Sequence, residues 1–371
     1  MILLNDFRRH WQEVQEDATD AFRSTAESGW YVLGRQVKEF EAELAEFWGV
    51  RHAVGVGSGL DALELSLCAL GCRAGDKVLT TPVSAFATTL AIVRLGAVPV
   101  FVDTDESGLV DLAAAGETFR SDTSIRFFVP VHLFGNSLDL DRLRSLAREY
   151  EVTIVEDCAQ SIGSEWQGEA TGTAGAAGAT SFYPTKNLGA MGDGGAVLTN
   201  DSELANGVAV LRDYGQSAKY QHSVIGYNSR LDELQAALLR RAGLPRLKRW
   251  TERRREVASR YLSEIRHGSV RLPCASMRSH SCWHLFPVMV EPGHKTSFMN
   301  ELKSRGVLTG EHYPQAIPDQ EAMNTVPFEI AGSGIERARR FCSTEVSLPI
   351  HPYLQDEEVS AVIDSVNCWR P

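Results

Sequence analysis

A lysine that follows a short apolar segment is the residue of this sequence best placed to do covalent chemistry. Lys186 lies in the run TSFYPTKNLG, residues 180–189, and four glycines occupy positions 189, 192, 194 and 195. Pro184 ends regular strand pairing, so we expect Lys186 to project from a loop, where the glycines allow close backbone approach. A desolvated lysine has a lowered pKa and can form a Schiff base. Taken alone, a lone lysine of this kind is more typically a solvated loop residue.

Two further segments carry groups that could serve the same chemistry. Residues 153–157, TIVED, are typical of a buried strand, and this strand ends in the carboxylates Glu156 and Asp157. A second strand, residues 53–56, runs into Gly57-Ser58-Gly59, after which a helical pattern begins at Leu60. A strand, a glycine turn and a helix direct backbone amides and the positive helix end at an anion. The spacing differs from the dinucleotide fingerprint, so we interpret the turn as a cradle for a single phosphate, with a plain tight turn as the alternative.

The elements that must position these residues alternate between strands and helices. Strands are predicted at residues 53–56, 77–81, 98–103, 125–131, 153–157 and 195–199, and helices at 34–47, from 60 onward, at 84–95, 140–150 and 204–211. Nearly continuous apolar strands that alternate with helices indicate a mainly parallel sheet covered on both faces. Ligands of such sheets bind beyond the carboxyl ends of the strands. The residues that follow predicted strands, and that one site could collect, are Gly59, Phe86, His132, Asp157 and Lys186.

The second half of the chain predicts a smaller unit. A helix is expected over residues 232–241, ended by Gly243 and Pro245, followed by a charged helix from 246 to about 265. This pattern divides the chain into a large domain, residues 1–245, and a small C-terminal α+β domain, residues 246–371. The N-terminal segment is assigned to the large domain, with packing on the small domain as the alternative.

Composition excludes several classes of function. The 371 residues contain 37 basic and 48 acidic side chains, a net charge of −11, so the chain lacks the footprint of a nucleic-acid-binding protein. The basic run at residues 246–255 is interpreted as a solvated helix face. Seven cysteines without a CxxC pair indicate a reducing compartment, and no apolar run is long enough to span a membrane. We therefore expect a cytoplasmic protein that needs neither nucleic acid nor membrane, and we predict no metal site.

Three motifs in this order give the chain a specific resemblance. These motifs are EDCAQ at 156–160, SFYPTKNLG at 181–189 and GYNSRLDELQAA at 226–237. Together they resemble the pyridoxal-phosphate (PLP) sugar aminotransferases of the DegT/DnrJ/EryC1/StrS family, over nearly the whole chain. The resemblance implies an aspartate-aminotransferase-like α/β fold, PLP fold type I, with a mostly parallel seven-stranded sheet in the large domain. It also implies a homodimer whose two active sites are shared between the subunits.

The resemblance implies a role for each matching residue. Lys186 would form the Schiff base with PLP and move the proton, and Asp157 would hold the pyridine nitrogen protonated. The other residues implied for cofactor binding are Ser58, Gly59, Leu60, Phe86, Gln160, Ser181 and, from the facing subunit, Asn228. The residues implied for the sugar substrate and its diphosphate are Tyr183, Lys219, Arg230, His312 and Tyr313.

The resemblance also implies a reaction and its substrates. An amino acid, expected to be L-glutamate, gives its amine to the cofactor, and a nucleotide-linked keto-deoxysugar takes it in a ping-pong cycle. The motif wording resembles members acting on dTDP-3-keto-6-deoxyhexoses, with 4-keto sugars or ketocyclitols as alternatives. The family's dehydratase branch carries histidine at the position of Lys186 and is thereby excluded.

Two positions depart from the family pattern, and two other functional classes compete with a transaminase. Leu60 stands where many members have threonine, and Pro318 stands where histidine is frequent, which leaves one side of the sugar pocket undefined. A nicotinamide-dependent sugar oxidoreductase would share the alternating sheet, but the glycine spacing does not fit it. A non-catalytic nucleotide-sugar sensor would bind the cofactor without turnover, and the presence of Lys186, Asp157 and Gln160 argues against it.

Overall fold

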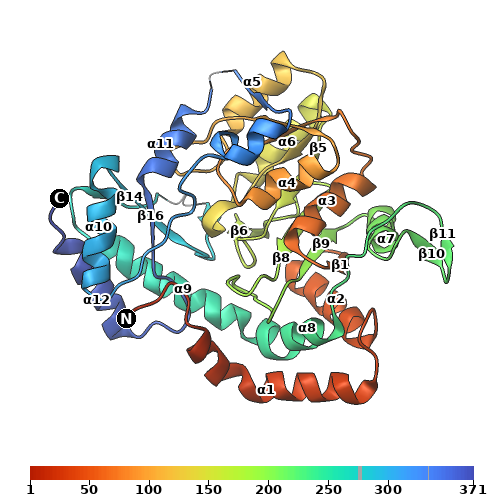
Figure 1. Ribbon diagram of the computed structural model, residues 1–371, viewed down its shortest axis with the longest axis horizontal. Helices are drawn as coiled ribbons and strands as arrows, with labels where there is room; N and C mark the ends of the chain where they lie inside the picture. Colours follow the sequence, from red (N-terminus) through yellow and green to blue (C-terminus); the bar gives the residue numbers. More distant parts are fainter. Residues whose placement is uncertain (275–277, 333) are drawn as a thin grey trace.

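The chain is built around one large sheet that is parallel except at one strand. The structure, a computed structural model, describes residues 1–274, 278–332 and 334–371 (Figure 1). Strand β9 is antiparallel to both of its neighbours, whereas the strands from β8 to β15 run parallel. In spatial order the strands are β1 (His52–Val56), β9 (Gly195–Thr199), β8 (Ala177–Ser181), β5 (Thr153–Asp157), β4 (Ile125–Val129), β2 (Lys77–Thr80), β3 (Val98–Phe101) and β15 (Glu329–Ile330).

Helices cover both faces of this sheet, and successive strand residues point to opposite faces. In β2, Val78 packs into one apolar cluster and Leu79 into another. The first cluster includes residues of α3 (Gly59–Ala69), α4 (Phe86–Arg94) and α7 (Ser202–Leu211). Clusters on the other face include residues of α2 (Arg35–Trp48), α5 (Leu112–Ser121), α6 (Leu140–Tyr150) and α8 (Glu233–Leu238). The predicted α/β fold with a covered, mainly parallel sheet is confirmed, and the two-residue strand β15 extends the expected seven strands to eight.

A separate antiparallel sheet organises the C-terminal region. Its strands are β12 (Val270–Arg271), β14 (Phe286–Val290) and β16 (Glu345–Leu348), packed against α9 (Leu244–Glu264), α10 (Pro292–Ser304) and α12 (Asp356–Asn367). The N-terminal Ile2 forms a parallel bridge with Val307 and packs on the same cluster. The start of the chain therefore contacts the C-terminal region, while the boundary between domains 1–245 and 246–371 stays a prediction.

The predicted helix break at Gly243 and Pro245 is wrong. Helix α8 continues through a π-helical turn, Leu239–Gly243, directly into α9, and the Leu244 amide donates to the Leu239 carbonyl. Pro245 directly follows the π-helical turn and has no N–H to donate into it, while Arg246 Nη1 donates to the Ala242 carbonyl at 3.1 Å. A side chain at position 243 would come within 2.6 Å of Leu188, so the glycine serves close packing rather than chain reversal.

The basic run of α9 is only partly solvated. Helix α1 (Phe7–Ser28) lies along α8 and α9 (Figure 1), and its Glu13 pairs with both Arg246 and Arg249. Arg254 is buried and donates to the carbonyl of Ile350 at 2.6 Å, so the prediction of a solvated face is wrong for this residue. Burial lowers the pKa of Arg254 to about 10.

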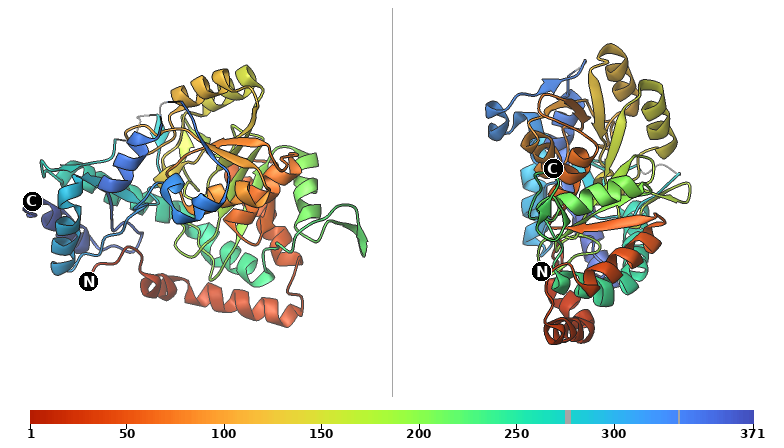
Figure 2. Two further views of the ribbon diagram at one scale, coloured as in Figure 1. Left: turned by 45° about the horizontal axis from the view of Figure 1, so that its top comes forward. Right: turned by 90° about the vertical axis from the view of Figure 1, so that its right-hand side faces the viewer.

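One hairpin stands away from the body of the molecule. Strands β10 (Gln216–Ala218) and β11 (Gln221–His222) form it, and Figure 2 shows it projecting outward beyond α7. Its neighbourhood exposes apolar side chains, with Tyr220 82% and Ile225 95% exposed. Among the described helices, none combines the length and apolar character that crossing a membrane requires.

Candidate active site

Lys186 occupies a tight turn directly after β8. Its backbone amide donates to the carbonyl of Tyr183 at 2.8 Å, which closes the turn that Pro184 begins. Burial lowers the pKa of the Lys186 amine to about 8, although the Asp157 carboxylate opposes the shift. An amine with this pKa is neutral in a far larger fraction of molecules near pH 7 than an ordinary lysine, and the neutral form can act as a nucleophile or a base.

Asp157 ends β5 in the interior of the same site. The amide of Ala159 donates to its Oδ1 at 3.0 Å, and the Thr88 hydroxyl donates to its Oδ2 at 2.8 Å. Burial raises the pKa of Asp157, and these two hydrogen bonds and the Lys186 charge counteract the rise. Both oxygens of this buried carboxylate are therefore held in place by protein donors.

Glu156 and His132 lie beside this carboxylate and form part of the scaffold. The Leu138 amide donates to His132 Nδ1, so Nε2 carries the proton and donates to Glu156 at 2.8 Å. Glu156 also accepts from three backbone amides, those of Gly172, Ala174 and Gly175. Burial opposes ionisation, but His132 and these amides hold the pKa of Glu156 below its ordinary value. The expectation that His132 joins the reactive groups is not supported, because both of its nitrogens are engaged.

The amino end of α3 faces Ser181 at the end of β8. Ser58 caps this helix by accepting from the Asp61 amide at 3.1 Å. A Cβ at Gly59 would lie 2.6 Å from Ser181 Cβ, so only glycine permits this approach. The amides of Gly59 and Leu60, a positive helix end and the half-buried Ser181 hydroxyl thus lie together, as a phosphate site requires.

Gln160 and Phe86 occupy other sides of the site. Gln160 Oε1 accepts from the Phe134 amide at 2.6 Å, and its Nε2 donates to the Tyr313 hydroxyl at 3.1 Å. The structure therefore joins Gln160 to Tyr313, across 153 positions of sequence. Phe86 begins α4 and is 36% exposed, which leaves part of its ring open for contact.

His312 lies next to Tyr313 and is influenced by Lys186. Burial and the Lys186 charge lower its pKa to about 4, so its imidazole is neutral at physiological pH. His284 is also buried, and its pKa is lowered by burial and by the same lysine. His312, Tyr313, Gln160, Asp157 and Lys186 thus belong to one connected region.

Four other predicted residues lie at or near the surface. Tyr183 is 53% exposed, Asn228 is exposed, and Lys219 lies at the tip of the β10–β11 hairpin with its amine over the Tyr220 ring. Arg230 pairs with Asp213 at 2.8 Å and lies over the Tyr214 ring. Within the described chain, no hydrogen bond or ion pair links Asn228, Lys219 or Arg230 to Lys186.

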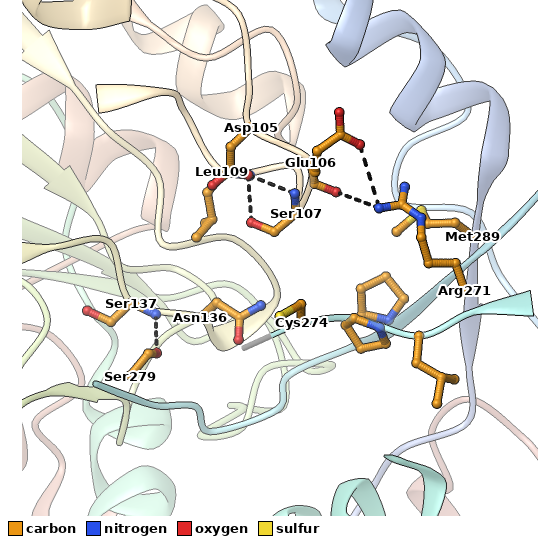
Figure 3. A pocket seen from close by; sticks show the side chains of 13 residues that line it. Asp105, Glu106, Ser107, Leu109, Asn136, Ser137, Arg271, Cys274, Ser279 and Met289 are labelled. Carbon is orange, nitrogen blue, oxygen red and sulfur yellow. Dashed lines mark hydrogen bonds and ion pairs between the residues drawn. The ribbon is translucent and has the colours of Figure 1, made fainter. Parts of the chain in front are cut away.

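A cavity of about 560 Å³ lies elsewhere, between the loop after β3 and the strands of the C-terminal sheet (Figure 3). Arg271 and Glu106 form an ion pair of 3.6 Å at its edge. None of the predicted site residues lines this cavity, so we do not assign the lysine chemistry to it.

A lysine of lowered pKa, a buried aspartate and a phosphate-type helix terminus at the carboxyl end of one sheet are the features of the type I fold of PLP enzymes. The comparisons agree with this class. The chain belongs to the DegT/DnrJ/EryC1/StrS aminotransferase family, whose model matches residues 12–367. The predicted family, fold class and enzyme class are thereby confirmed.

Relatives with assigned names match over nearly their whole length. The chain is 39% identical to dTDP-3-amino-3,4,6-trideoxy-alpha-D-glucose transaminase of Streptomyces venezuelae, over 98% of this chain and 95% of the relative. It is 40% identical to the erythromycin biosynthesis sensory transduction protein EryC1 of Saccharopolyspora erythraea, over 96% of each. The crystal structure of S. venezuelae DesV with a ketimine intermediate superposes with a TM-score of 0.93 at 38% identity, covering 99% of this chain and 97% of that chain.

The residues present fit the cofactor that this family implies. The approach of Gly59 to Ser181 leaves the α3 amides free to face a phosphate, and Asp157 offers the buried carboxylate that a pyridinium nitrogen needs. Lys186 and Gln160 lie in the same region, with a nucleophilic amine and an amide group. When bound, the cofactor supplies an electron sink for carbanions, which no amino-acid side chain provides.

Several residues that organise the site were not singled out from the sequence. Thr88 and Ser229 are two of them, and Ser229 accepts from the Gly57 amide at 3.0 Å and donates to Asp61 at 2.8 Å. Glu345 and Ser347, which contact His312, are two more. A hydroxyl at a helix start or a carboxylate within a strand carries no distinctive spacing, although Ser229 lies inside the recognised GYNSRLDELQAA motif.

Proposed function

We propose that the protein is a PLP-dependent transaminase that moves an amino group from L-glutamate to a nucleotide-linked keto-deoxysugar. The proposed acceptor is a dTDP-3-keto-6-deoxyhexose. The observation that carries the proposal is the half-buried amine of Lys186, with its pKa lowered to about 8, and the buried Asp157 carboxylate that interacts with it. Such a pair suits proton transfer between two carbons with one lysine base.

The chain's own residues divide the work of the proposed ping-pong cycle. Lys186 serves as the Schiff-base lysine and as the base that moves the proton. Asp157, held by Thr88 and Ala159, would keep the ring nitrogen of the bound cofactor protonated. Ser58, Gly59, Leu60 and Ser181 would hold the phosphate, and Phe86 and Gln160 would contact the ring.

The substrate assignment rests on the relatives and on the polar residues that the family resemblance implies for substrate binding. Two relatives named as transaminases of dTDP-linked 3-aminosugars, from Streptomyces venezuelae and Aneurinibacillus thermoaerophilus, are 39% and 38% identical. Tyr183, His312 and Tyr313 are proposed to line the sugar pocket. Lys219 and Arg230 are proposed to bind the diphosphate, because two cations suit its charge. A 4-keto sugar or a ketocyclitol is the alternative outcome of a substrate screen.

We propose a homodimer in which the two subunits share each site. Asn228 of one subunit would contact the phosphate bound by the other, in keeping with its exposed position. The exposed apolar residues Trp30, Tyr31 and Ile225 offer surface for such contact. A cytoplasmic location is proposed because the seven free cysteines are typical of a reducing compartment.

Visible absorption of the purified, cofactor-loaded protein tests this function. We expect a yellow band that shifts to shorter wavelength when L-glutamate is added without any sugar. Nucleotide-linked keto sugars should then restore the yellow band, and the sugar that restores it fastest defines the acceptor. A protein that remains colourless after incubation with PLP would contradict the assignment of the site.

A sensor function is the second candidate, because one relative carries the name of a sensory transduction protein. A sensor would show the yellow band but no change with glutamate, glutamine or other amino acids. The lowered pKa of Lys186 and the buried Asp157 favour the enzyme, because a protein that only binds has no need of a base in this position.

A further inference from the structure

Two polar residues of β16 point toward the segment that carries His312. Glu345 and Ser347 are two positions apart and therefore share one face of the strand. Both are fully buried, with an exposed fraction of 0%. Ser347 also exchanges both backbone hydrogen bonds with Gly310, which fixes the start of the His312 segment on β16.

The hydrogen bonds of these residues form a chain that ends at the His312 ring. Glu345 Oε2 accepts from the His312 amide at 2.6 Å, and Glu345 Oε1 accepts from the Ser347 hydroxyl at 2.6 Å. Ser347 Oγ lies 2.9 Å from His312 Nδ1. Because Ser347 has one proton and gives it to the carboxylate, it can only accept from the ring. His312 must then carry its proton on Nδ1.

His312 Nε2 is the free end of this chain. It makes no hydrogen bond within the described residues, whereas Nδ1 is engaged by Ser347. His312 also lies close enough to Lys186 for the lysine charge to lower its pKa, so the ring belongs to the reactive region. A neutral imidazole with Nδ1 protonated presents Nε2 as a hydrogen-bond acceptor.

We propose that Glu345 and Ser347 are positioning residues that fix His312 in its Nδ1–H form, so that Nε2 accepts a hydrogen bond from a hydroxyl of the sugar substrate. The inference rests on the proposed function for the identity of the substrate. The tautomer itself follows from the contacts of this chain when Glu345 is ionised.

The charge of Glu345 sets the direction of the chain. A protonated Glu345 would donate from Oε1 to Ser347, Ser347 would donate to Nδ1, and His312 would carry its proton on Nε2. Burial raises the pKa of Glu345 to about 7, against the Ser347 hydroxyl, the His312 amide and the Lys295 charge, with Glu311 adding to the rise. Lys295 of α10 is itself paired with Glu311 at 2.7 Å. The Nδ1–H form should therefore prevail at about pH 8 and decline toward pH 6.

Histidine tautomers provide a test that does not depend on activity. In cofactor-loaded protein labelled with ¹⁵N-histidine, the His312 signal is assigned by its loss in His312→Gln. At pH 8 we expect the wild type to show Nδ1 protonated, and Glu345→Gln to show Nε2 protonated, because the new amide would donate to Ser347. Nε2 protonated in the wild type at pH 8, or an unchanged form in Glu345→Gln, would overturn the proposal.

Kinetics separate positioning from general loss of structure. For Ser347→Ala, we expect at least a tenfold fall in kcat/KM for dTDP-3-amino-3,6-dideoxyhexose in the reverse direction, with the glutamate half-reaction within twofold of wild type. Ser343→Ala, at a half-buried site on α11 (Glu336–Thr344) whose hydroxyl donates to the Arg340 carbonyl, is the matched control and should change neither. An unaltered sugar reaction in Ser347→Ala would contradict the inference. If the wild type did not react with glutamate, the proposed function would be contradicted instead. The tautomer measurement would then still decide whether Glu345 and Ser347 fix His312 in its Nδ1–H form.

Discussion

Thr88 Oγ1 lies 2.8 Å from Asp157 Oδ2, at the end of a short chain of hydroxyl groups. Because an ionised carboxylate only accepts, Thr88 gives its proton to Asp157 and accepts in turn from Ser84, 2.7 Å away. Ser84 lies just before α4, and Thr88 lies in its first turn. The start of this helix therefore fixes the carboxylate proposed to contact the cofactor's ring nitrogen.

Replacing Thr88 by valine should slow transamination while leaving the fold intact. Valine keeps the shape but removes the donor, and a hydrogen bond to a charged group contributes about 1.5–3 kcal/mol. We expect a fall of about 10–100-fold in the rate of the glutamate half-reaction, measured by stopped-flow absorption. Thr88→Ser keeps the hydroxyl and should stay near the wild-type rate. Equal rates for the valine and serine variants would show that the donor is unimportant.

Replacing Gly59 by alanine should weaken cofactor binding. The new Cβ would lie 2.6 Å from Ser181 Cβ, so either the helix start or Ser181 must move from the phosphate position. We expect at least a tenfold rise in the PLP dissociation constant, measured by equilibrium dialysis. Gly207→Ala is the matched control, because its Cβ would meet only Ala69 Cβ, at 3.6 Å. Unchanged affinity in Gly59→Ala would remove this glycine from the proposed phosphate site.

Much of the fold follows from local sequence patterns. The strands at 153–157 and 195–199 have the predicted bounds, because polar or glycine residues on either side of a continuous apolar run mark where the strand begins and ends. The helix break at Gly243 was wrong because a glycine needed for contact with Leu188 looks the same in sequence as one that ends a helix. Propensity describes the isolated segment, whereas packing decides the outcome.

The reactive residues could be predicted only where a motif marks them. Lys186 and Asp157 lie in recognisable runs, but Thr88 reaches Asp157 across 69 positions and Ser347 reaches His312 across 35. Serine and threonine are common at helix starts and in strands, so the residue type alone does not predict that one of them will contact a reactive residue far away in the sequence. The tertiary contacts that set the protonation of a carboxylate or an imidazole become visible only in the structure.

Mixed dimers should reveal whether the two subunits share a site. Lys186→Ala removes the amine of one site, and Asn228→Asp places a negative charge beside the phosphate that Asn228 is proposed to hold. In a dimer with one variant of each kind, one shared site is intact and the other carries both changes. Random mixing should restore about a quarter of wild-type activity, since half of the dimers are mixed and half of their sites are intact.

Each variant alone, refolded by the same procedure, is the control and should remain nearly inactive. An activity of the mixture no higher than the average of the two variants would show that each site is built by one chain. A residual activity of Asn228→Asp near wild type would instead remove this residue from the phosphate site.

Replacing Glu156 by glutamine should destabilise the fold in a pH-dependent way. Glu156 accepts four hydrogen bonds in a fully buried position, from His132 and three amides, and glutamine would turn a donor toward two of them. Disrupting a buried charged network of this kind costs about 3 kcal/mol of unfolding free energy.

The folded-state pKa of Glu156 is lowered, so the stabilisation that its charge provides is complete above the unfolded pKa of about 4.3 and is lost as the pH falls through the folded value. Urea unfolding should therefore show a larger deficit for Glu156→Gln at pH 7 than at about pH 3, below the unfolded pKa, whereas Glu16→Gln, at an exposed site on α1, should change stability at neither pH. A deficit of equal size at both pH values would show that Glu156 acts through its shape and not through its charge.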